Sequence, residues 1–159
     1  MADKKQIFLF TDGAAKGNPG RGGYGVVLRF GRHEKELSQG FKETTNNRME
    51  LLAVIAGLEA LTTNNHPVAI YSDSKYVVDA INKGWLSKWV KTGFKKKKNV
   101  DLWQRLLPLQ KKYDLHFHWI KGHAGHPENE RCDELAVMAA EGSKLIVDDG
   151  FGKDDGFFS

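Results

Sequence analysis

The chain has 159 residues, of which 40% are hydrophobic and 28% are charged, and this composition is ordinary for a globular domain with its own core. Its single cysteine, Cys132, excludes an intrachain disulfide, no apolar run approaches membrane-spanning length, and no secretory signal begins the sequence. The net charge of +4 is modest, and its distribution along the chain is more informative than its size. We therefore expect a cytoplasmic domain that works in a reducing compartment.

The first predicted element is a strand from Ile7 to Gly13 that ends in one carboxylate, Asp12. By the two-residue period of a strand, Phe8 and Phe10 share a face with Asp12, while the opposite face is mostly apolar. Apolar residues on both faces predict a central strand that is covered on both sides. An unpaired buried charge is costly, so Asp12 is either a turn residue before Gly13 or a member of a charged site.

The segment of residues 13–25 is rich in glycine and contains the pattern G-x-G-x-x-G at residues 20–25. A dinucleotide-binding loop with this pattern is followed by a helix, whereas residues 24–30 have the chemistry of a strand. We therefore predict a hairpin loop, whose glycines allow another backbone or a ligand to approach closely. A half-exposed strand over residues 34–41 completes three antiparallel strands.

A helix is predicted over residues 48–61, after capping-type residues at positions 44–47. Glu50 is the one acid on a helical face that is otherwise apolar. An acid in the first turn is favoured by the helix dipole, and this would explain an exposed Glu50. On a face that packs against a sheet, however, Glu50 indicates a charged site.

A second short apolar strand, over residues 68–72, again ends in a carboxylate, Asp73. It repeats the pattern of Asp12, in which an apolar strand delivers an acid at its C-terminal end. A helix over residues 74–83 follows and stops at Gly84.

The last third of the chain contains two more helices and a strand. Residues 99–113 are predicted as a helix, in which Pro108 predicts a kink or a break. Residues 115–120 are the fifth predicted strand. A loop then leads into a final helix that ends near Gly142, where Asp133 is again an acid on an apolar stripe.

Residues 83–98, here called the basic segment, contain seven lysines and no acid. Trp85, Trp89 and Phe94 are interspersed among them. A nucleic-acid backbone fits such a segment, because lysines neutralise phosphates while aromatic rings pack against sugars or bases. The alternatives are a solvated lysine face and, for one of the two tryptophans, a role as a core anchor.

We expect a single domain over residues 1–145. The remaining residues, 146–159, form an acidic and glycine-rich tail, which we predict to be mobile. The sequence assigns no function to this tail.

The order of the elements predicts an α/β fold, with a five-stranded mixed sheet flanked by helices on both faces. Ligands of such sheets bind at the C-terminal ends of the strands, where Asp12 and Asp73 lie, and Glu50 and Asp133 can approach from helices. Two carboxylates about 4 Å apart repel by roughly 4 kcal/mol at an effective dielectric of about 20, so protons or hard cations must accompany them. All-oxygen ligands favour Mg²⁺ or Mn²⁺, and two such ions about 3.5–4 Å apart can clamp a phosphoryl displacement.

Other candidate sites have weaker support. His123, His126 and Cys132 do not have the spacing of a standard zinc site. His116 and His118 alternate on a predicted strand, and such histidines are more often packed or exposed than ligating. The sequence has no G-x-S-x-G elbow, which argues against acyl transfer.

The chain resembles bacterial type 1 ribonuclease H in five motifs that occur in the family's order within residues 6–142. The motifs are Thr11-Asp12-Gly13, Gly17-Asn18-Pro19-Gly20, Thr44-Thr45-Asn46-Asn47-Arg48-Met49-Glu50-Leu51, Ser72-Asp73-Ser74, and Lys121-Gly122-His123-Ala124-Gly125-His126-Pro127 continuing to Asp133. The resemblance implies a ribonuclease H-like fold and a monomeric endoribonuclease that hydrolyses the RNA strand of RNA–DNA hybrids, leaving 5′-phosphate and 3′-hydroxyl ends. It also implies a two-metal-ion mechanism with Mg²⁺, for which Mn²⁺ could substitute.

The resemblance implies roles for individual residues. It makes Asp12, Glu50, Asp73 and Asp133 the catalytic carboxylates that bind metal, and Asp73 also helps to position the attacking water. His123 matches the histidine that assists proton movement or product release, which suits an imidazole near neutral pH.

Further positions match the family's contacts to the hybrid. They are Gly13, Asn18, Thr45, Asn46, Asn47, Lys75, Trp85, Lys88, Trp89, Lys91, Lys95 and Lys96. Contacts to the ribose 2′-hydroxyl let such a site recognise RNA. Two departures weaken the match: the basic segment is short after Phe94 and lacks the family's proline, and Lys75 replaces a frequent glutamine, so a charge stands in place of an amide.

Two other function classes share this fold. A hybrid-binding module without catalysis would have no use for four clustered acids. A polynucleotidyl transferase usually needs further domains. Cleavage of a labelled hybrid with and without Mg²⁺ discriminates among these classes.

Overall fold

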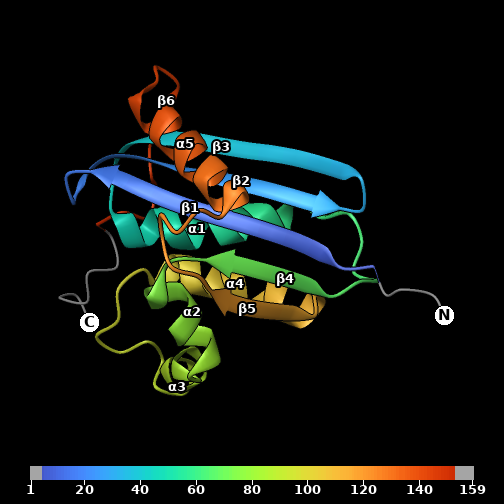
Figure 1. Cartoon of the computed structure of the whole chain (residues 1–159). Coiled ribbons are helices and arrows are strands. Elements are labelled where there is room, and N and C mark those ends of the chain that lie inside the picture. The colour runs from blue at the N-terminus through green and yellow to red at the C-terminus, as the bar shows by residue number, and fades with distance from the viewer. Residues whose placement is uncertain (1–4, 153–159) are drawn as a thin grey trace.

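The computed structural model describes residues 5–152 as one sheet with helices on both faces (Figure 1). Its strands are β1 (Ile7–Lys16), β2 (Gly20–Phe30), β3 (His33–Thr44), β4 (Val68–Ser72), β5 (Leu115–Trp119) and β6 (Leu145–Ile146). Its helices are α1 (Asn46–Glu59), α2 (Lys75–Asn82), α3 (Trp85–Lys91), α4 (Val100–Lys112) and α5 (Pro127–Glu141). Within the described range, no helix combines the length and the apolar character needed to cross a lipid bilayer.

The strands lie in the order β5-β4-β1-β2-β3-β6, so β1 is central. β1, β2 and β3 are antiparallel neighbours, whereas β4 pairs parallel with β1 and β5 pairs parallel with β4. This confirms the predicted mixed sheet of three antiparallel strands followed by parallel strands. The sequence does not predict the sixth strand, β6, because a two-residue strand carries no periodic signal.

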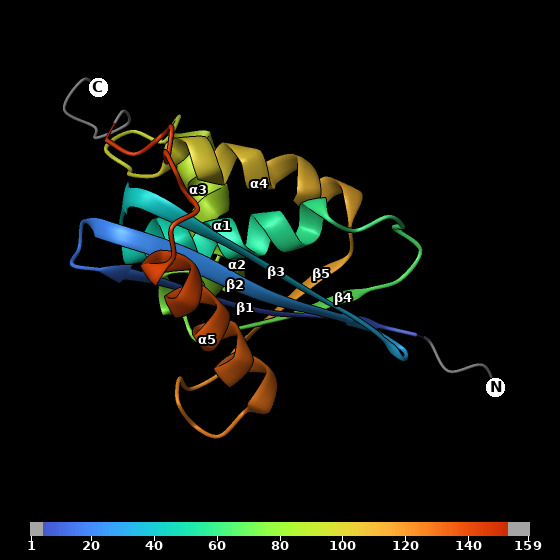
Figure 2. The ribbon, with the colours of Figure 1, turned by 90° about the horizontal axis from the view of Figure 1, so that it is seen from above.

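The two faces of the sheet are covered by different helices. α1 packs against β1 and β2 on one face with α4 outside it, whereas α5 packs against β1, β2 and β3 on the other face (Figure 2). In α1, Met49, Leu51, Val54, Ile55 and Leu58 are completely buried. Burying a side chain of this size contributes roughly 1.5–3 kcal/mol, so α1 is held firmly against the centre of the sheet.

Glycines in β2 set the distance between α5 and the sheet. A side-chain carbon at Gly25 would lie only 2.2 Å from the backbone carbonyl oxygen of Cys132 in α5. The predicted hairpin loop at residues 13–25 is therefore mostly strand, and the turn is confined to residues 17–19. The hairpin itself is confirmed, but its loop was predicted too long, because most of these glycines lie in strands. The expectation that they let another backbone approach closely is confirmed at Gly25.

Two helical features also differ from expectation. α4 is continuous through Pro108, so the predicted break does not occur. The sequence does not predict α3, which lies within the basic segment and begins after Gly84, a residue with a φ of 75°. Glycine adopts this left-handed conformation without steric cost, which allows the sharp change of direction between α2 and α3.

The residues after α5 are in contact with the domain up to the end of the described range. Asp148 accepts hydrogen bonds from Arg48 Nε at 2.7 Å and from Thr44 Oγ1 at 2.6 Å. Arg48 is almost completely buried, and its guanidinium also contacts Asp101 at the start of α4. The guanidinium thus joins α1, α4 and the C-terminal segment. The tail predicted to be mobile begins at residue 146, and its residues 153–159 lie outside the described structure.

Candidate active site

Three carboxylates meet at the C-terminal ends of two parallel strands. Asp12 lies in β1, Asp73 directly follows β4, and Glu50 enters from α1, one turn after the helix begins. One oxygen atom of each carboxylate lies within 4.8 Å of those of the other two. The strands bring Asp12 and Asp73 together because β1 and β4 are neighbours, with Phe10 paired to Tyr71 just before the two acids.

Gly13 allows Glu50 to reach this cluster. A side-chain carbon at Gly13 would lie 2.4 Å from the backbone nitrogen of Glu50 and 2.4 Å from the carbonyl carbon of Met49. Only glycine permits this approach of α1 to β1, so the residue after Asp12 places the second carboxylate beside the first. The local sequence Asp12-Gly13 therefore serves packing as well as chemistry.

The cluster opposes the ionisation of its own members. Burial, and then the charge of Asp73, raise the pKa of Asp12 to about 8, although the backbone N–H of Gly13 donates to its Oδ1 at 2.9 Å and acts in the opposite direction. Burial, followed by the charges of Asp12 and Asp73, raises the pKa of Glu50 well above its ordinary value. Carboxylates in such surroundings are protonated or accompanied by a cation at neutral pH.

Two oxygen atoms in the cluster indicate what the site can hold. Glu50 Oε1 and Asp73 Oδ1 are buried and have no hydrogen-bond partner among the described residues. A buried acceptor without a donor costs about 1–3 kcal/mol, and a cation with oxygen ligands would remove that cost. The donor set, made only of carboxylate oxygens, fits a hard divalent ion rather than zinc.

Asp133 lies at the edge of this cluster. It is carried by α5, which approaches the sheet closely over Gly25, and it contributes to the raised pKa of Asp12. Its carboxylate is not among the three whose oxygens lie within 4.8 Å of one another. The structure therefore brings three of the four predicted ligands together and places the fourth beside Asp12.

The loop between β5 and α5 forms one wall of the site. His123, with a φ of 56°, and His126 line the same cleft as Asp12, Asp73 and Asp133. A side-chain carbon at Gly122 would lie 2.6 Å from Asp73 Oδ2, so the loop backbone lies close to this carboxylate and leaves no room for a side chain at residue 122.

Trp119 is a residue of this site that the sequence does not single out. Its indole Nε1–H donates to the backbone carbonyl oxygen of Asp73 at 3.0 Å, and the Nζ of Lys75 lies 4.8 Å from the centre of its ring. The pairing of Ser72 with Trp119 in adjacent strands explains the contact. That register cannot be read from the sequence, because it depends on which strands are neighbours.

The residues matched to hybrid contacts form a second group beside the cluster. Asn18 Oδ1 accepts a hydrogen bond from the backbone N–H of Asn46 at 3.1 Å, and Asn46 Oδ1 accepts one from that of Ala15 at 2.7 Å. Thr45 caps α1, because its Oγ1 accepts the N–H of Arg48 at 3.3 Å. These bonds fix the β1–β2 turn to the start of α1, where Asn46 and Asn47 are exposed.

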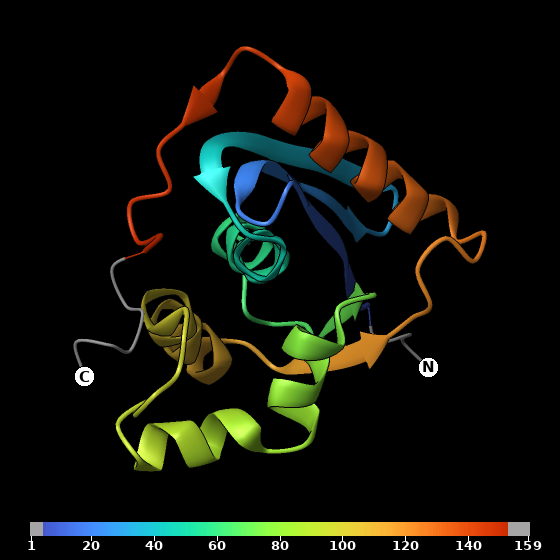
Figure 3. The same ribbon diagram turned by 90° about the vertical axis from the view of Figure 1, so that its left-hand side faces the viewer.

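The basic segment lies away from the sheet, on and after α3 (Figure 3). Trp85 is exposed, with the Nζ of Lys83 at 5.6 Å from its ring centre. Trp89 instead packs edge-on against the buried Trp103, with ring centres 5.4 Å apart. One tryptophan is therefore a core anchor, as the alternative interpretation of the segment allows. Lys88, Lys91, Lys95 and Lys96 are exposed.

The zinc alternative is not supported by the geometry. Cys132 is buried, its thiol donates to the carbonyl oxygen of Phe10 at 3.2 Å, and burial raises its pKa far above the ordinary range of a thiol. Among the described residues, only Asp12, Glu50 and Asp73 form a cluster of potential metal ligands.

The sequence matches the ribonuclease H family over residues 4–141. It is 56% identical over 149 residues to the Ribonuclease H of Desulforamulus reducens, with 91% of this chain and 93% of that protein covered. It is 54% identical over 153 residues to the Ribonuclease H of Pectobacterium carotovorum, with 93% of this chain and 97% of that protein covered.

Solved structures have a similar fold. LC11-RNase H1 in complex with an RNA/DNA hybrid has a TM-score of 0.63 and 27% sequence identity, with 84% of this chain and 96% of that chain covered. RNase H1 from the halophilic archaeon Halobacterium salinarum has a TM-score of 0.66 and 26% identity, with 84% and 96% covered. The match over residues 4–141 and the identity to bacterial relatives across almost their full length show that this chain belongs to the ribonuclease H family.

Proposed function

We propose that this chain hydrolyses the RNA strand of RNA–DNA hybrids with Mg²⁺ held by Asp12, Glu50 and Asp73, and with Asp133 completing the site from α5. Metal-dependent hydrolysis of RNA in a hybrid is the activity of the ribonuclease H family, to which the chain belongs. The observation that carries the assignment is the carboxylate cluster with two buried, unpartnered oxygens. Bound divalent ions supply neutralisation of charge and activation of water for an in-line displacement at phosphorus.

The chain's own residues prepare the site for that reaction. Asp73 is fixed by Trp119 at its carbonyl oxygen and by Gly122 against its carboxylate, so it is suited to orient the attacking water. His123 lies in the same cleft on an exposed loop, where an imidazole can give a proton to the leaving oxygen or assist its release. The reaction leaves a 5′-phosphate and a 3′-hydroxyl.

Substrate binding is assigned to the two groups of residues beside the cluster. Gly13, Asn18, Thr45, Asn46 and Asn47 face the hybrid near the carboxylates, where amides can read the ribose 2′-hydroxyl. Exposed lysines of the basic segment, with Trp85, hold the DNA strand through its phosphates, and Lys75 also contributes a charge near Asp73. The family resemblance supports action as a cytoplasmic monomer, with Mn²⁺ as a possible substitute ion.

Cleavage of a hybrid with separately labelled strands tests this proposal. We expect the RNA strand to be cut in Mg²⁺ and to remain intact in EDTA, with 3′-hydroxyl ends on the products. The DNA strand, duplex DNA and duplex RNA are the controls. Cleavage in EDTA, or a cut DNA strand, would overturn the assignment.

A further inference from the structure

The face of the sheet on which α5 packs also carries a layer of aromatic rings. α5 packs against β1, β2 and β3, whereas β4 and β5 lie to one side of this helix (Figure 1). Tyr71 of β4 and His118 of β5 lie on this part of the face. Phe8 and Phe10 of β1 adjoin it, and Phe10 also packs against the buried cluster that includes Cys132 and Leu135 of α5. Phe8, Phe10 and Tyr71 are half-buried, and His118 is exposed.

Three of these rings form a row across three strands, here called the ring row: Phe10, Tyr71 and His118. The strands pair Phe10 with Tyr71 and Tyr71 with His118. The centres of the Phe10 and Tyr71 rings are 5.4 Å apart with planes inclined at 21°, and those of Tyr71 and His118 are 5.0 Å apart at 22°. The rings are therefore stacked one on the next, and the stack ends at His118 on the edge strand β5.

The ring row lies directly behind the carboxylate cluster. Phe10 precedes Asp12 by two residues in β1, so the two side chains are neighbours on the same face of that strand. Tyr71 precedes Asp73 by two residues, and Asp73 directly follows the end of β4. Two residues of a strand span about 7 Å, so the Phe10 ring lies about that far along β1 from Asp12. A strand of nucleic acid whose phosphate is at the carboxylates can reach the row without a gap.

Positive charge is available at the same edge of the sheet. Lys75 and Lys121 are exposed, and the Nζ of Lys75 is held 4.8 Å from the ring centre of Trp119, the residue after His118. Arg29 also lies near the row, 5.7 Å from the Phe10 ring, but Glu34 and Glu128 already pair with it. His118 and Trp119 are consecutive in β5, so their side chains point to opposite faces of the sheet, and Lys75 meets a phosphate at the edge of β5 rather than over the ring row. Lys121, which follows β5, is the second exposed cation at this edge.

We propose that the ring row, with Lys75 and Lys121, binds a single-stranded extension of the RNA strand next to the cut site, with an unpaired base stacked on the exposed face of His118. This inference rests on the proposed function, in which the carboxylates hold the RNA strand and the basic segment holds the DNA strand. The strand that continues from the carboxylates to the ring row is then RNA. An unpaired base is required because a base in a duplex is already stacked on both faces.

Binding of hybrids with and without an extension tests the proposal. Fluorescence anisotropy is measured in EDTA, so that nothing is cleaved, on a blunt hybrid and on hybrids with about six unpaired nucleotides at the 5′ or 3′ end of either strand. We expect an RNA extension at one end to tighten binding by about tenfold, because stacking on an aromatic side chain tolerates any base. An extension of the DNA strand should give no such gain.

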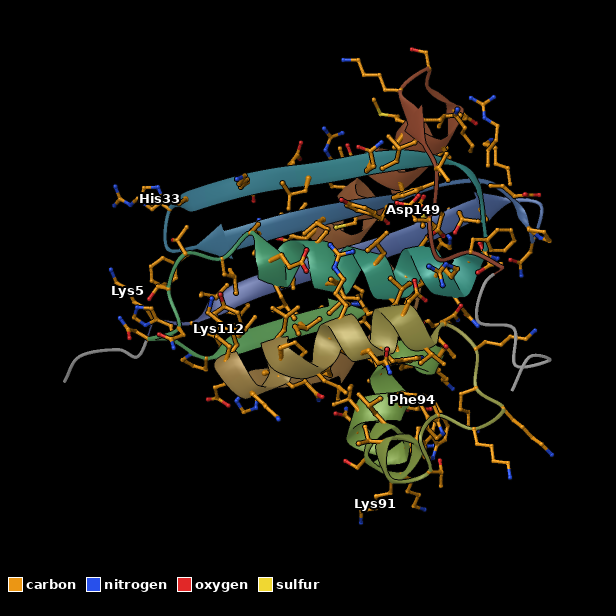
Figure 4. All side chains as sticks on the ribbon, turned by 180° about the vertical axis from the view of Figure 1, so that it is seen from behind. Lys5, His33, Lys91, Phe94, Lys112 and Asp149 are labelled. Atoms are coloured by element: carbon orange, nitrogen blue, oxygen red, sulfur yellow. The ribbon has the colours of Figure 1, made fainter. Side chains whose placement is uncertain are left out.

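Substitutions at His118 separate stacking from packing. His118→Ala should abolish the gain from the RNA extension and leave blunt-hybrid affinity unchanged, and His118→Phe should restore the gain. His33→Ala is the matched control, because His33 is an exposed histidine at the opposite end of the sheet (Figure 4). Thermal unfolding of each variant checks that the fold is retained.

The results distinguish this inference from the proposed function. Equal affinity for blunt and extended hybrids, a gain from the DNA extension alone, or a gain that survives His118→Ala would overturn the ring row as a binding surface. Cleavage of the blunt hybrid in Mg²⁺ would remain in all of those cases, because the blunt hybrid does not reach the row. Failure to cleave any hybrid would instead refute the proposed function.

Discussion

Asp12 lies in an environment that opposes its charge. Burial is the largest cause and Asp73 is the next, and they raise its pKa from 3.8 to about 8. In metal-free buffer the folded protein therefore holds this proton more tightly than the unfolded chain does. The resulting contribution to stability is fully present below a pH of about 4 and is lost as the pH rises through about 8.

We expect Asp12→Asn to abolish Mg²⁺-dependent cleavage and to stabilise the metal-free protein at alkaline pH. Each kcal/mol of relieved repulsion corresponds to roughly 2–4 °C in Tm for a domain of this size. Thermal unfolding in EDTA from about pH 5.5 to about pH 8.5 should show a falling Tm for the wild type and a flatter profile for the variant. If Tm fell with pH equally in the variant and the wild type, or if the variant still cleaved the hybrid, the role given to Asp12 would be contradicted.

His123 differs from the carboxylates, because it lies on an exposed loop of the same cleft. We expect His123→Ala to lower kcat by about 10²-fold or less, the usual scale of assistance by proton transfer, with KM little changed. Steady-state kinetics on a blunt hybrid at saturating Mg²⁺ measures both constants, and His126→Ala, on the same loop, is the control. Complete loss of activity with the fold intact would show a more central role for His123.

At the scale of elements, α3 and the residues after it present the lysines. The anchor is Trp89, which packs against Trp103, while Lys91 points away from the domain in Figure 4. Lys95, Lys96 and Lys98 are exposed, whereas Lys97 is half-buried with its Nζ 5.1 Å from the centre of the Trp89 ring. Phe94 is buried and fastens the loop after α3 to the rest of the core. The exposed lysines can therefore be changed without disturbing the core, and thermal unfolding checks the effect of removing the Lys97 contact with Trp89.

We expect simultaneous replacement of Lys95 to Lys98 by alanine to raise KM and leave kcat nearly unchanged, because these residues bind the ground state and the transition state alike. Each phosphate contact contributes about 0.7–0.9 to the slope of log affinity against log salt, so the slope should flatten by about one or more. KM at several salt concentrations measures this. Alanine at Lys35, Lys42, Lys111 and Lys112, which are exposed elsewhere, is the control. An unchanged slope would exclude a binding role.

At the scale of the whole molecule, Arg48 connects elements that are distant in the sequence. Its side chain is 1% exposed and that of Asp148 is 6% exposed, and their contact joins α1 to the C-terminal segment. Breaking one partner of a buried ion pair leaves an uncompensated charge, which typically costs about 3–5 kcal/mol.

We therefore expect Asp148→Asn to lower the free energy of unfolding, by up to about 3–5 kcal/mol. Asp149→Asn is the matched control, because Asp149 is an exposed neighbour with the same side chain and should change stability by no more than about 0.5 kcal/mol. Urea unfolding in EDTA compares them without any effect of bound metal. Equal free energies of unfolding for Asp148→Asn and the wild type would show that Asp101 alone compensates the buried charge of Arg48.

The sequence predicted those parts of the molecule that depend on local pattern. The alternation around Asp12 and the apolar strand before Asp73 gave the strands, their acids and the order of the elements. It did not predict what depends on distant partners: that α5 is the element packed on Gly25, the pairing of β6 with β3, and the contact of Trp119 with Asp73. These features come from pairings between segments that are far apart in the chain, and no periodic signal records such pairings.

The central position of β1 has a consequence for how the molecule folds. The carboxylates come from β1, α1 and the end of β4, so the cluster closes only after β1 has paired with a strand that is remote in sequence. Such non-local pairings form slowly, because the loop between them must close first. A divalent ion that needs all three acids binds the completed domain and stabilises it by mass action. Ion binding during refolding should therefore follow the slowest pairing step and report the moment at which the chain becomes competent for catalysis.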